Sequence, residues 1–171
     1  MKIVLDTNVL VSGLLRPFGT SGEIVRMVSS SILVLQYDSR ILLEYKDVLY
    51  RPKFKFDKEH IDLLLDYTKK NGQLVPILPL KHSLPDPDDE AFLEVAIGGK
   101  AECLITGNKT HYPRQFREGI KILSPSEFIN FYRKRKKNTE PPHAQGRSLT
   151  AGFVGEARSG DRGHGQAQPA G

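Results

Sequence analysis

Residues 3–10 read IVLDTNVL, a short apolar run that ends at an acidic residue, Asp6. A second apolar run, CLITG at residues 103–107, ends in the same way at an amide residue, Asn108. Both runs are continuously apolar rather than alternating, which is typical of parallel strands that are covered on both faces. Because ligands of open parallel sheets bind just beyond the carboxyl ends of the strands, we expect Asp6 and Asn108 to face a common site.

Strand and helix patterns alternate along the rest of the chain. The strands are predicted at residues 2–6, 32–35, 74–78, 102–106 and 120–123. The helices, with their caps included, are predicted at residues 8–15, 20–29, 39–50, 57–70, 88–99 and 124–133. Ser39 and Asp57 are the expected caps of two helices, and SPSE at residues 124–127 is a capping box. This alternation predicts an α/β fold with three layers, α/β/α, around a central, mostly parallel sheet.

A glutamate falls on the apolar stripe of the predicted helix at residues 39–50. Glu44 follows Ile41 by three residues and precedes Val48 by four, so all three share one helix face. A side chain on that face points toward the sheet rather than toward solvent. The alternative is a partly exposed residue that pairs with a nearby basic side chain, for which the candidates are Arg40, Lys46 and Arg51.

A cluster of aspartates, DPDD at residues 86–89, begins the predicted helix at 88–99. Asp89 lies one turn before Phe92, which places it on the buried face of that helix. Asp88 is the alternative: it is a candidate ligand as well as a candidate N-cap. Acidic residues at a helix start also have a simpler explanation, because they complement the helix dipole.

Carboxylates that converge on one site repel each other unless a cation lies between them. The candidate ligands are oxygen donors, which suit a hard ion such as Mg²⁺ or Mn²⁺. Asp6 is the strongest candidate, because a carboxylate buried at the end of an apolar strand is costly without a partner. The alternative for Asp6 is a helix cap or a local turn with Thr7 and Asn8. We predict Asp6, Glu44 and Asp89 as catalytic residues and as metal ligands, with Asp88 and Asn108 as further ligands.

Five segments at suitable spacing resemble those of PIN-domain ribonucleases, the superfamily that includes VapC-type toxins. The resemblance covers about residues 1–132 and includes IVLDTNVL at 3–10, Glu44, DPDDEAFLEVA at 86–96, LITGN at 104–108 and ILSPSEF at 122–128. No segment is specific alone, but all five occur in order. Most members have a fourth aspartate where this chain has Asn108, and this departure bears on metal affinity.

The resemblance implies a PIN-like fold and a metal-dependent endoribonuclease that uses Mg²⁺ or Mn²⁺. It also implies a toxin of a type II toxin–antitoxin pair, a cognate antitoxin as partner, and a homodimer. A catalytically weakened PIN domain that mainly binds RNA or a protein is the alternative, which the Asn108 departure favours. A phosphatase of the haloacid dehalogenase type is disfavoured, because its second aspartate would stand at Asn8. The chain also lacks the glycine-rich motifs of nucleotide binders.

Several residues near the strand ends are candidates for RNA contact. The predicted substrate-binding residues are Thr7, Asn8, Arg16, Thr106 and Lys109. Tyr112 and Phe116 lie among basic residues and are candidates for stacking on bases, with a merely solvated loop as the alternative. His111 is interpreted as a loop histidine, and a contribution to the site is the alternative.

Composition limits the remaining possibilities. The chain has 171 residues, a net charge of +5 and a single cysteine, Cys103, which excludes an internal disulfide. It has no apolar run of membrane-spanning length and no signal-peptide pattern, so we expect a cytoplasmic protein without a membrane partner. Residues 138–171 are rich in Gly, Pro, Gln and Ser, which predicts a disordered tail after a nuclease domain at residues 1–137.

Overall fold

The protein is described by a computed structural model in which residues 1–139 have a defined structure. Its centre is a sheet in which every neighbouring pair of strands is parallel, in the order β3-β2-β1-β4-β5. The strands are β1 (Lys2–Leu5), β2 (Val34–Tyr37), β3 (Gln73–Leu74), β4 (Cys103–Ile105) and β5 (Lys121–Leu123). This arrangement confirms the predicted parallel sheet.

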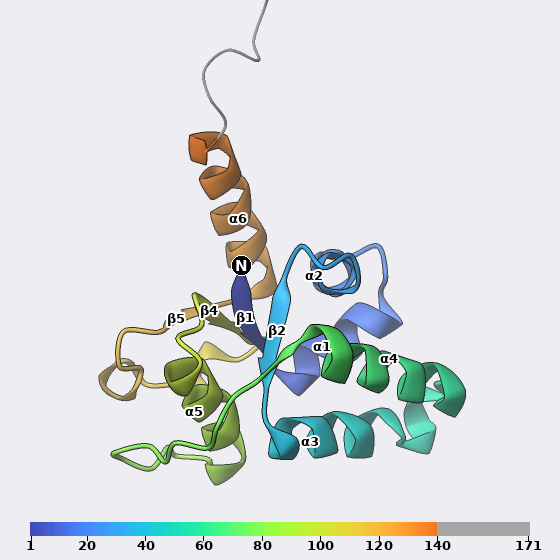
Figure 1. Ribbon diagram of the computed structural model, residues 1–171, viewed down its shortest axis with the longest axis horizontal. Coiled ribbons are helices and arrows are strands. Elements are labelled where there is room, and N and C mark those ends of the chain that lie inside the picture. The colour runs from blue at the N-terminus through green and yellow to red at the C-terminus, as the bar shows by residue number, and fades with distance from the viewer. Residues whose placement is uncertain (140–171) are drawn as a thin grey trace, which may run out of the picture. The chain divides into compact units, whose positions relative to one another are not determined.

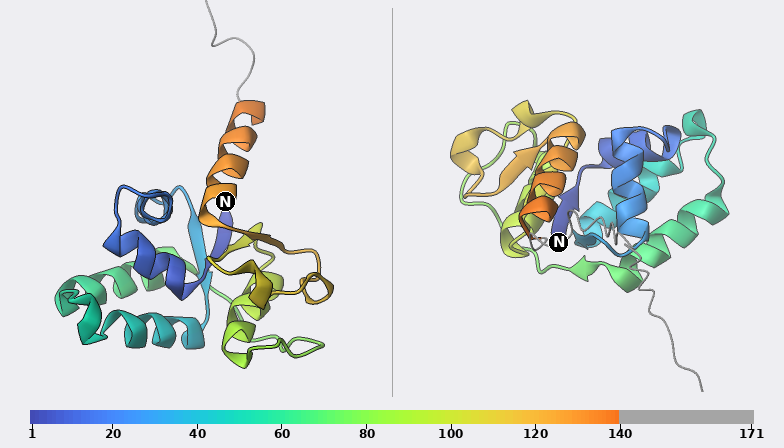
Figure 2. Two further views of the ribbon diagram at one scale, coloured as in Figure 1. Left: turned by 180° about the vertical axis from the view of Figure 1, so that it is seen from behind. Right: turned by 90° about the horizontal axis from the view of Figure 1, so that it is seen from above.

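Helices cover both faces of this sheet (Figure 1). They are α1 (Thr7–Leu15), α2 (Thr20–Ser29), α3 (Ser39–Leu49), α4 (Lys58–Asn71), α5 (Glu90–Gly98) and α6 (Pro125–Thr139). Helix α5 packs against β1, β2 and β4, while α1, α2 and α4 lie on the opposite side of the sheet. Helix α6 contacts β5 and α2, as the two further views in Figure 2 also show. The three-layer α/β/α prediction is therefore confirmed.

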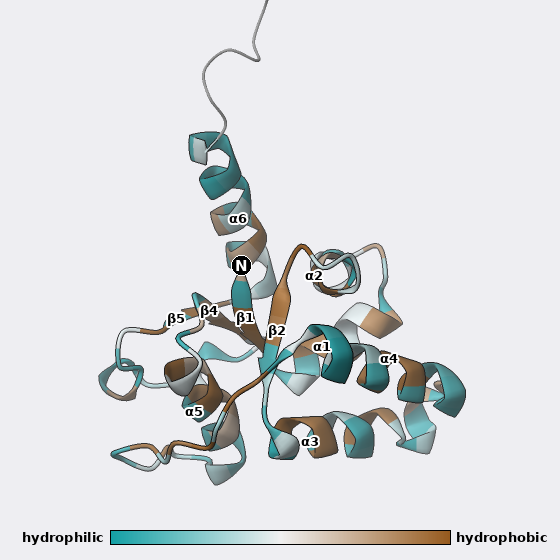
Figure 3. Cartoon of the chain, viewed as in Figure 1, coloured by the Kyte–Doolittle hydropathy of each residue, from teal (hydrophilic) through white to brown (hydrophobic). Residues whose placement is uncertain are grey.

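The core forms between the sheet and its helices. The strand residues Ile3, Val4 and Leu104 are fully buried, and α5 contributes Phe92 to the same core. Figure 3 shows that β2 is largely hydrophobic, whereas the outer end of α6 is hydrophilic. Because β1 and β4 are central and buried, the residues that follow their carboxyl ends are held on a rigid base.

The starts of the helices confirm some predicted caps and correct another. The Asp57 carboxylate accepts a hydrogen bond from the backbone N–H of Glu59 at 2.8 Å, as expected of a cap. The predicted capping box is also present, since the Ser124 N–H donates to the Glu127 carboxylate at 2.8 Å. Ser39, however, is the first residue of α3 and not its cap. The cap is Asp38, because its carboxylate is the group that accepts from the Ile41 N–H.

Element bounds differ most from the predictions at two strands and one helix, and elsewhere by one or two residues at an end. The second strand runs over residues 34–37 rather than 32–35, and the third over 73–74 rather than 74–78. Helix α6 continues to Thr139, beyond its predicted end at residue 133. Residues 1–139 form one compact unit, and the predicted tail lies outside the described residues from position 140 onward. Within residues 1–139, no helix is long and apolar enough to cross a membrane.

Candidate active site

Asp6 lies where β1 ends and α1 begins. Its backbone N–H donates to the Ile105 carbonyl at 2.9 Å, which fixes it beside the end of β4. Its side chain is 6% exposed, and Oδ2 accepts a hydrogen bond from the Thr106 hydroxyl at 2.6 Å. Oδ1 accepts from the Asn8 N–H at 3.1 Å, so Asp6 also caps α1. The carboxylate is therefore held rigidly at the edge of the sheet where the strand ends meet.

Glu44 approaches Asp6 from α3. The Thr7 hydroxyl donates to Glu44 Oε1 at 2.6 Å, and the side chain is half-buried. Burial raises the pKa of Glu44, and the charges of Asp6, Asp88 and Asp89 raise it further. Its three candidate basic partners pair elsewhere: Arg40 with Asp38 and Glu94, Lys46 with Asp62, and Arg51 with Asp47. Glu44 thus points toward the other carboxylates and away from the basic residues of its own helix.

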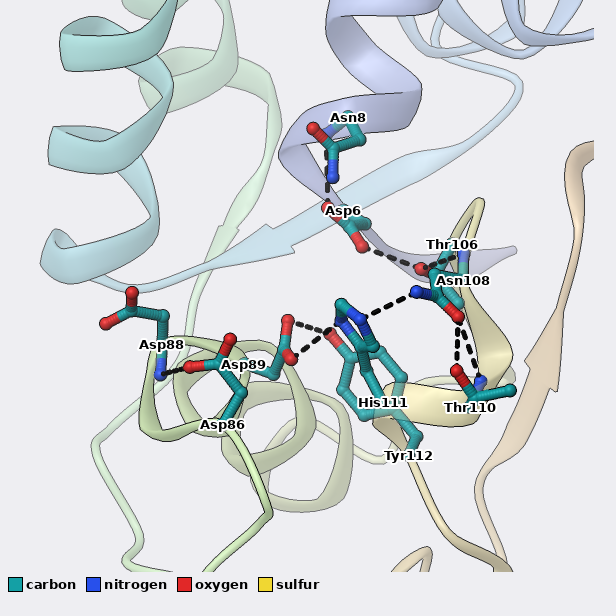
Figure 4. A network of polar contacts seen from close by, with 10 residues as sticks. All are labelled: Asp6, Asn8, Asp86, Asp88, Asp89, Thr106, Asn108, Thr110, His111 and Tyr112. Carbon is teal, nitrogen blue, oxygen red and sulfur yellow. Dashed lines mark hydrogen bonds and ion pairs between the residues drawn. The ribbon is translucent and has the colours of Figure 1, made fainter.

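Asp89 ends a short 3-10 turn, Pro87–Asp89, that leads into α5. Burial raises the pKa of Asp89, and the charges of Asp6 and Asp86 add to this while nearby His111 opposes it. Asp89 Oδ1 is 3.5 Å from the hydroxyl of Tyr112, which donates to it. Asp88 is exposed, and its side chain points in a different direction from that of Asp89 (Figure 4).

Asn108 uses its amide oxygen locally. Oδ1 accepts from the Thr110 N–H at 3.3 Å and from the Thr110 hydroxyl at 2.5 Å. The amide nitrogen instead faces His111, with Nδ2 at 2.6 Å from Nε2 (Figure 4). The other ring nitrogen of His111, Nδ1, lies 3.0 Å from Asp89 Oδ2. The loop after β4 therefore joins Asn108 to Asp89 through His111.

The predicted substrate-binding residues do not lie together. The hydroxyls of Thr7 and Thr106 are buried and hold the Glu44 and Asp6 carboxylates. The Asn8 side chain is exposed beside Asp6. These residues border the carboxylates directly, and the two threonines orient them.

Arg16 and Lys109 lie farther from the carboxylates or are already paired. Arg16 is at the opposite end of α1 from Asp6, and a helix of this length spans roughly 13 Å. Lys109 forms an ion pair with Glu127 of α6 at 2.6 Å. Substrate contact through either side chain stays a prediction.

The prediction that Tyr112 stacks on bases is wrong. Tyr112 is fully buried, and its hydroxyl is directed at Asp89. Phe116 is partly buried and packs against the core. Aromatic residues between basic ones suggested an RNA surface, but the loop folds inward and uses the Tyr112 ring as core.

Asp89 is contacted by Tyr112, which was not predicted as part of the site, and by His111, for which a role in the site was only the alternative. The only local signal is that His111 follows Asn108 by three residues, which is the spacing of a 3-10 turn, here Lys109–His111. That signal reveals the contact with Asn108 but not the contact with Asp89, which depends on how α5 packs.

The donor set of this site fits a divalent cation by its chemistry. Asp89 Oδ2 is buried and lacks a hydrogen bond of good geometry, despite its short distance to His111 Nδ1. The carboxylates of Asp6, Glu44 and Asp89 are hard oxygen donors whose mutual repulsion a cation would offset. In residues 1–139, no three acidic, histidine or cysteine side chains lie close enough together to hold one ion.

Comparison with known proteins agrees with this reading. A family model described as the PIN domain matches residues 2–110, a range that contains Asp6, Glu44, Asp89 and Asn108. The uncharacterized protein MJ1680 of Methanocaldococcus jannaschii is 30% identical over 145 residues, which cover 78% of this chain and 93% of the relative. PIN domains are generally nucleases that use divalent metal ions. The chain belongs to the PIN domain family, as the match to the family model shows, and its parallel sheet and strand-end carboxylates agree with this.

Proposed function

We propose that this protein is a metal-dependent endoribonuclease that hydrolyses RNA phosphodiester bonds. One observation carries the proposal: residues that follow β1 and β4 contact all three carboxylates, with Thr106 on Asp6, Thr7 on Glu44 and His111 on Asp89. Three carboxylates from β1, α3 and the start of α5 thus share one electrostatic environment without a basic residue that neutralises all of them. Such shared sites are a common feature of catalytic centres.

The chain's own residues orient the acidic groups. Thr106 holds Asp6, Thr7 holds Glu44, and Tyr112 holds one oxygen of Asp89. Asp6, Glu44 and Asp89 would hold Mg²⁺ or Mn²⁺ once the ion draws them closer together than they lie in this structure, and the ion would polarise a phosphoryl oxygen and lower the pKa of an attacking water. Fixed orientation of the carboxylates lowers the reorganisation that the reaction requires.

A covalent route through cysteine has no support in this chain. Burial raises the pKa of Cys103 to about 12, so the thiolate that would act as nucleophile does not form at neutral pH. Cys103 lies within β4 and is fully buried. Hydrolysis by an activated water is therefore the mechanism that the acidic site supports.

The wider biological role belongs to the same proposal. The net charge of +5 suits a polyanionic substrate such as RNA. The resemblance to VapC-type toxins supports a cytoplasmic toxin of a type II pair that acts as a homodimer and is inhibited by a cognate antitoxin. Co-purification with the product of a neighbouring gene would test that role separately from cleavage.

A catalytically weakened PIN domain that binds RNA or a protein is the second candidate. It is favoured by Asn108, whose amide oxygen is engaged by Thr110 and adds no charge to the acidic site. In this case RNA would bind without being cut. The two candidates therefore differ in turnover and not in binding.

Cleavage of a labelled RNA with Mg²⁺, with Mn²⁺ and with EDTA tests the proposal. We expect cleavage with either metal and none with EDTA. Asp6→Asn and Glu44→Gln should each reduce the rate on the order of 100-fold or more, because each removes a ligand charge. The matched control is Asp47→Asn, an exposed acid on the same helix as Glu44. Cleavage that survives EDTA would overturn the proposal, and binding without cleavage would favour the second candidate.

A further inference from the structure

We infer that Asn108 and His111 are positioning residues for Asp89: Asn108 fixes the imidazole proton on Nδ1, which faces the buried oxygen of Asp89. The inference rests on the proposed function, because it assigns these residues to the same active site. It also gives Asn108 a role other than that of a metal ligand that has lost its charge.

The orientation of the Asn108 amide follows from Thr110. A backbone N–H can only donate, and the Thr110 N–H lies 3.3 Å from Asn108 Oδ1. With the amide reversed, its NH₂ group would face that N–H, and two donors would oppose each other. The Thr110 hydroxyl, 2.5 Å from the same oxygen, donates a second hydrogen bond to it in this orientation. Asn108 Nδ2 is therefore the atom that faces His111.

This orientation determines the tautomer of His111. Asn108 Nδ2 is a donor, and it lies 2.6 Å from His111 Nε2, so Nε2 must accept. In a neutral imidazole with Nε2 as acceptor, the proton is on Nδ1. Nδ1 lies 3.0 Å from Asp89 Oδ2, so the protonated nitrogen is the one beside the carboxylate, although the contact lacks the geometry of a full hydrogen bond.

Asp89 Oδ2 is a buried acceptor that a neighbouring proton on Nδ1 would stabilise. It has no hydrogen bond of good geometry, while Tyr112 donates to the other oxygen, Oδ1. Two neighbouring residues of the loop after β4 therefore contact the two carboxylate oxygens, one each. Histidines that bind carboxylates in this way commonly fix the orientation of catalytic groups.

The chain thus has a physical reason for an amide at position 108. An aspartate there would present only acceptors to Nε2, so Nε2 would carry a proton and, in a neutral ring, Nδ1 would carry none. The lone pair of Nδ1 would then face the Asp89 carboxylate and repel it. Asn108→Asp should weaken the site, whereas a vacant metal position at 108 would predict the opposite.

The tautomer can be measured on the full chain without metal. We expect long-range ¹H–¹⁵N correlation spectra at neutral pH to show His111 with its proton on Nδ1, assigned by the signals lost in His111→Asn. In Asn108→Asp, Nε2 should carry a proton. A His111 with its proton on Nε2 in the unmodified protein, or a tautomer unchanged by Asn108→Asp, would overturn the inference.

A second measurement uses Mn²⁺ alone as the probe. His111→Phe keeps the ring but loses both nitrogens, and we expect Mn²⁺ affinity by calorimetry to fall about tenfold or more. His111→Asn retains a donor near the position of Nδ1 and should restore much of that affinity. His60→Phe, on the exposed surface of α4, is the matched control and should leave the affinity unchanged.

The two proposals fail in distinguishable ways. If Asp6→Asn abolishes cleavage but His111→Phe and Asn108→Asp leave Mn²⁺ affinity and the tautomer unchanged, the nuclease proposal stands and the positioning role is wrong. If the tautomer responds as expected but the protein cleaves no RNA with any metal, the geometric inference stands and the nuclease proposal is wrong. Stronger Mn²⁺ binding by Asn108→Asp would show that position 108 is a ligand, against the inference.

Discussion

At the scale of single residues, burial of the Glu44 and Asp89 carboxylates lowers the stability of the fold when they are charged. Glu44 and Asp89 both have raised pKa values, caused first by burial and then by neighbouring carboxylates. A carboxyl group with a raised folded-state pKa binds more protons in the folded than in the unfolded protein. Its contribution to stability is therefore complete at low pH and is lost as the pH rises through the folded-state value.

Replacing Glu44 should reveal this cost in the metal-free protein. Glu44→Gln keeps an acceptor for Thr7 and removes the charge, so it should stabilise the fold at pH 7 on the order of 1 kcal/mol. Near pH 4, where a glutamate is about half protonated even when unperturbed, the advantage should shrink. Urea unfolding in EDTA at both pH values measures it, with Asp47→Asn as control. A Glu44→Gln variant that is less stable at pH 7 would contradict the predicted sign.

Asp38 and Glu94 are also nearly buried, but they share a cation. Arg40 lies 2.6 Å from Asp38 and 2.5 Å from Glu94, so it joins the start of α3 to α5. Glu94 therefore lies beside a basic residue although it is on the buried side of α5. Asp38 and Glu94 are thus a structural acidic pair neutralised by Arg40, whereas the carboxylates around Asp6 share no such arginine in residues 1–139.

Removing that arginine should therefore destabilise the fold. Arg40→Gln would leave two nearly buried carboxylates without a cation, which we expect to cost roughly 1–3 kcal/mol, less than a fully buried pair because Arg40 is partly exposed. Chemical denaturation at pH 7 measures the loss. Arg51→Gln, which breaks an exposed pair with Asp47, should cost under about 0.5 kcal/mol. Equal losses in the two variants would show that burial of the carboxylates is unimportant.

At the scale of elements, the central strands were predictable and the outer strands were not. Strands β1 and β4 are continuously apolar, so the pattern and the structure agree. In β2, Gln36 is fully buried, because its amide nitrogen donates to Gln73 and to the Gly99 carbonyl. Nothing local shows that a glutamine has such distant partners, so the prediction ended the strand too early.

Strand β3 was predicted too long for a different reason. The apolar residues 74–78 suggested a strand, but Pro76 has no N–H to donate to the sheet. Pairing with β2 continues only through the Val75 N–H, which donates to the Tyr37 carbonyl. A backbone restriction thus outweighed the apolar pattern.

The same limit applies to the candidate site. Asp6, Glu44 and Asp89 could be predicted because each depends on a local rule, a strand end or a helix stripe. His111 and Tyr112 meet Asp89 from a different segment, and no periodicity reports that contact. The sequence predicts which elements carry the acidic residues of the candidate site, while the side chains that orient Asp89 depend on tertiary packing.

Helix α2 lies close to α1 and to the turn that joins the two helices, and each close contact requires a small residue. A Cβ atom on Gly22 would lie 2.3 Å from the Pro17 carbonyl oxygen, and one on Gly13 would lie 2.6 Å from Val25. Gly22→Ala should cost about 1–3 kcal/mol, because backbone atoms cannot rotate away. Thermal and urea unfolding measure the loss. Gly107→Ala, where a Cβ meets no atom within 4 Å, is the control, and equal stability of both variants would refute the close approach.

At the scale of the whole molecule, the compact unit is residues 1–139. The net charge of +5 also belongs to this unit. After Thr139, three arginines (147, 158 and 162) balance three acidic residues (140, 156 and 161), so that segment adds no net charge. Folding and attraction to RNA should therefore both be properties of residues 1–139.

A chain that ends at Thr139 should accordingly melt within a few degrees of the full chain, since a loss of 1 kcal/mol shifts the melting temperature by roughly 4 °C at this size. Its affinity for RNA should fall with salt along the same slope, because the slope counts phosphates neutralised by basic residues. Phe128→Ala tests the sensitivity of the melting assay. Phe128 is fully buried in α6, so this substitution should lower the free energy of unfolding by about 3–5 kcal/mol. Unchanged melting with a shallower salt slope would place RNA contacts after residue 139, because folding would then be intact while basic contacts were lost.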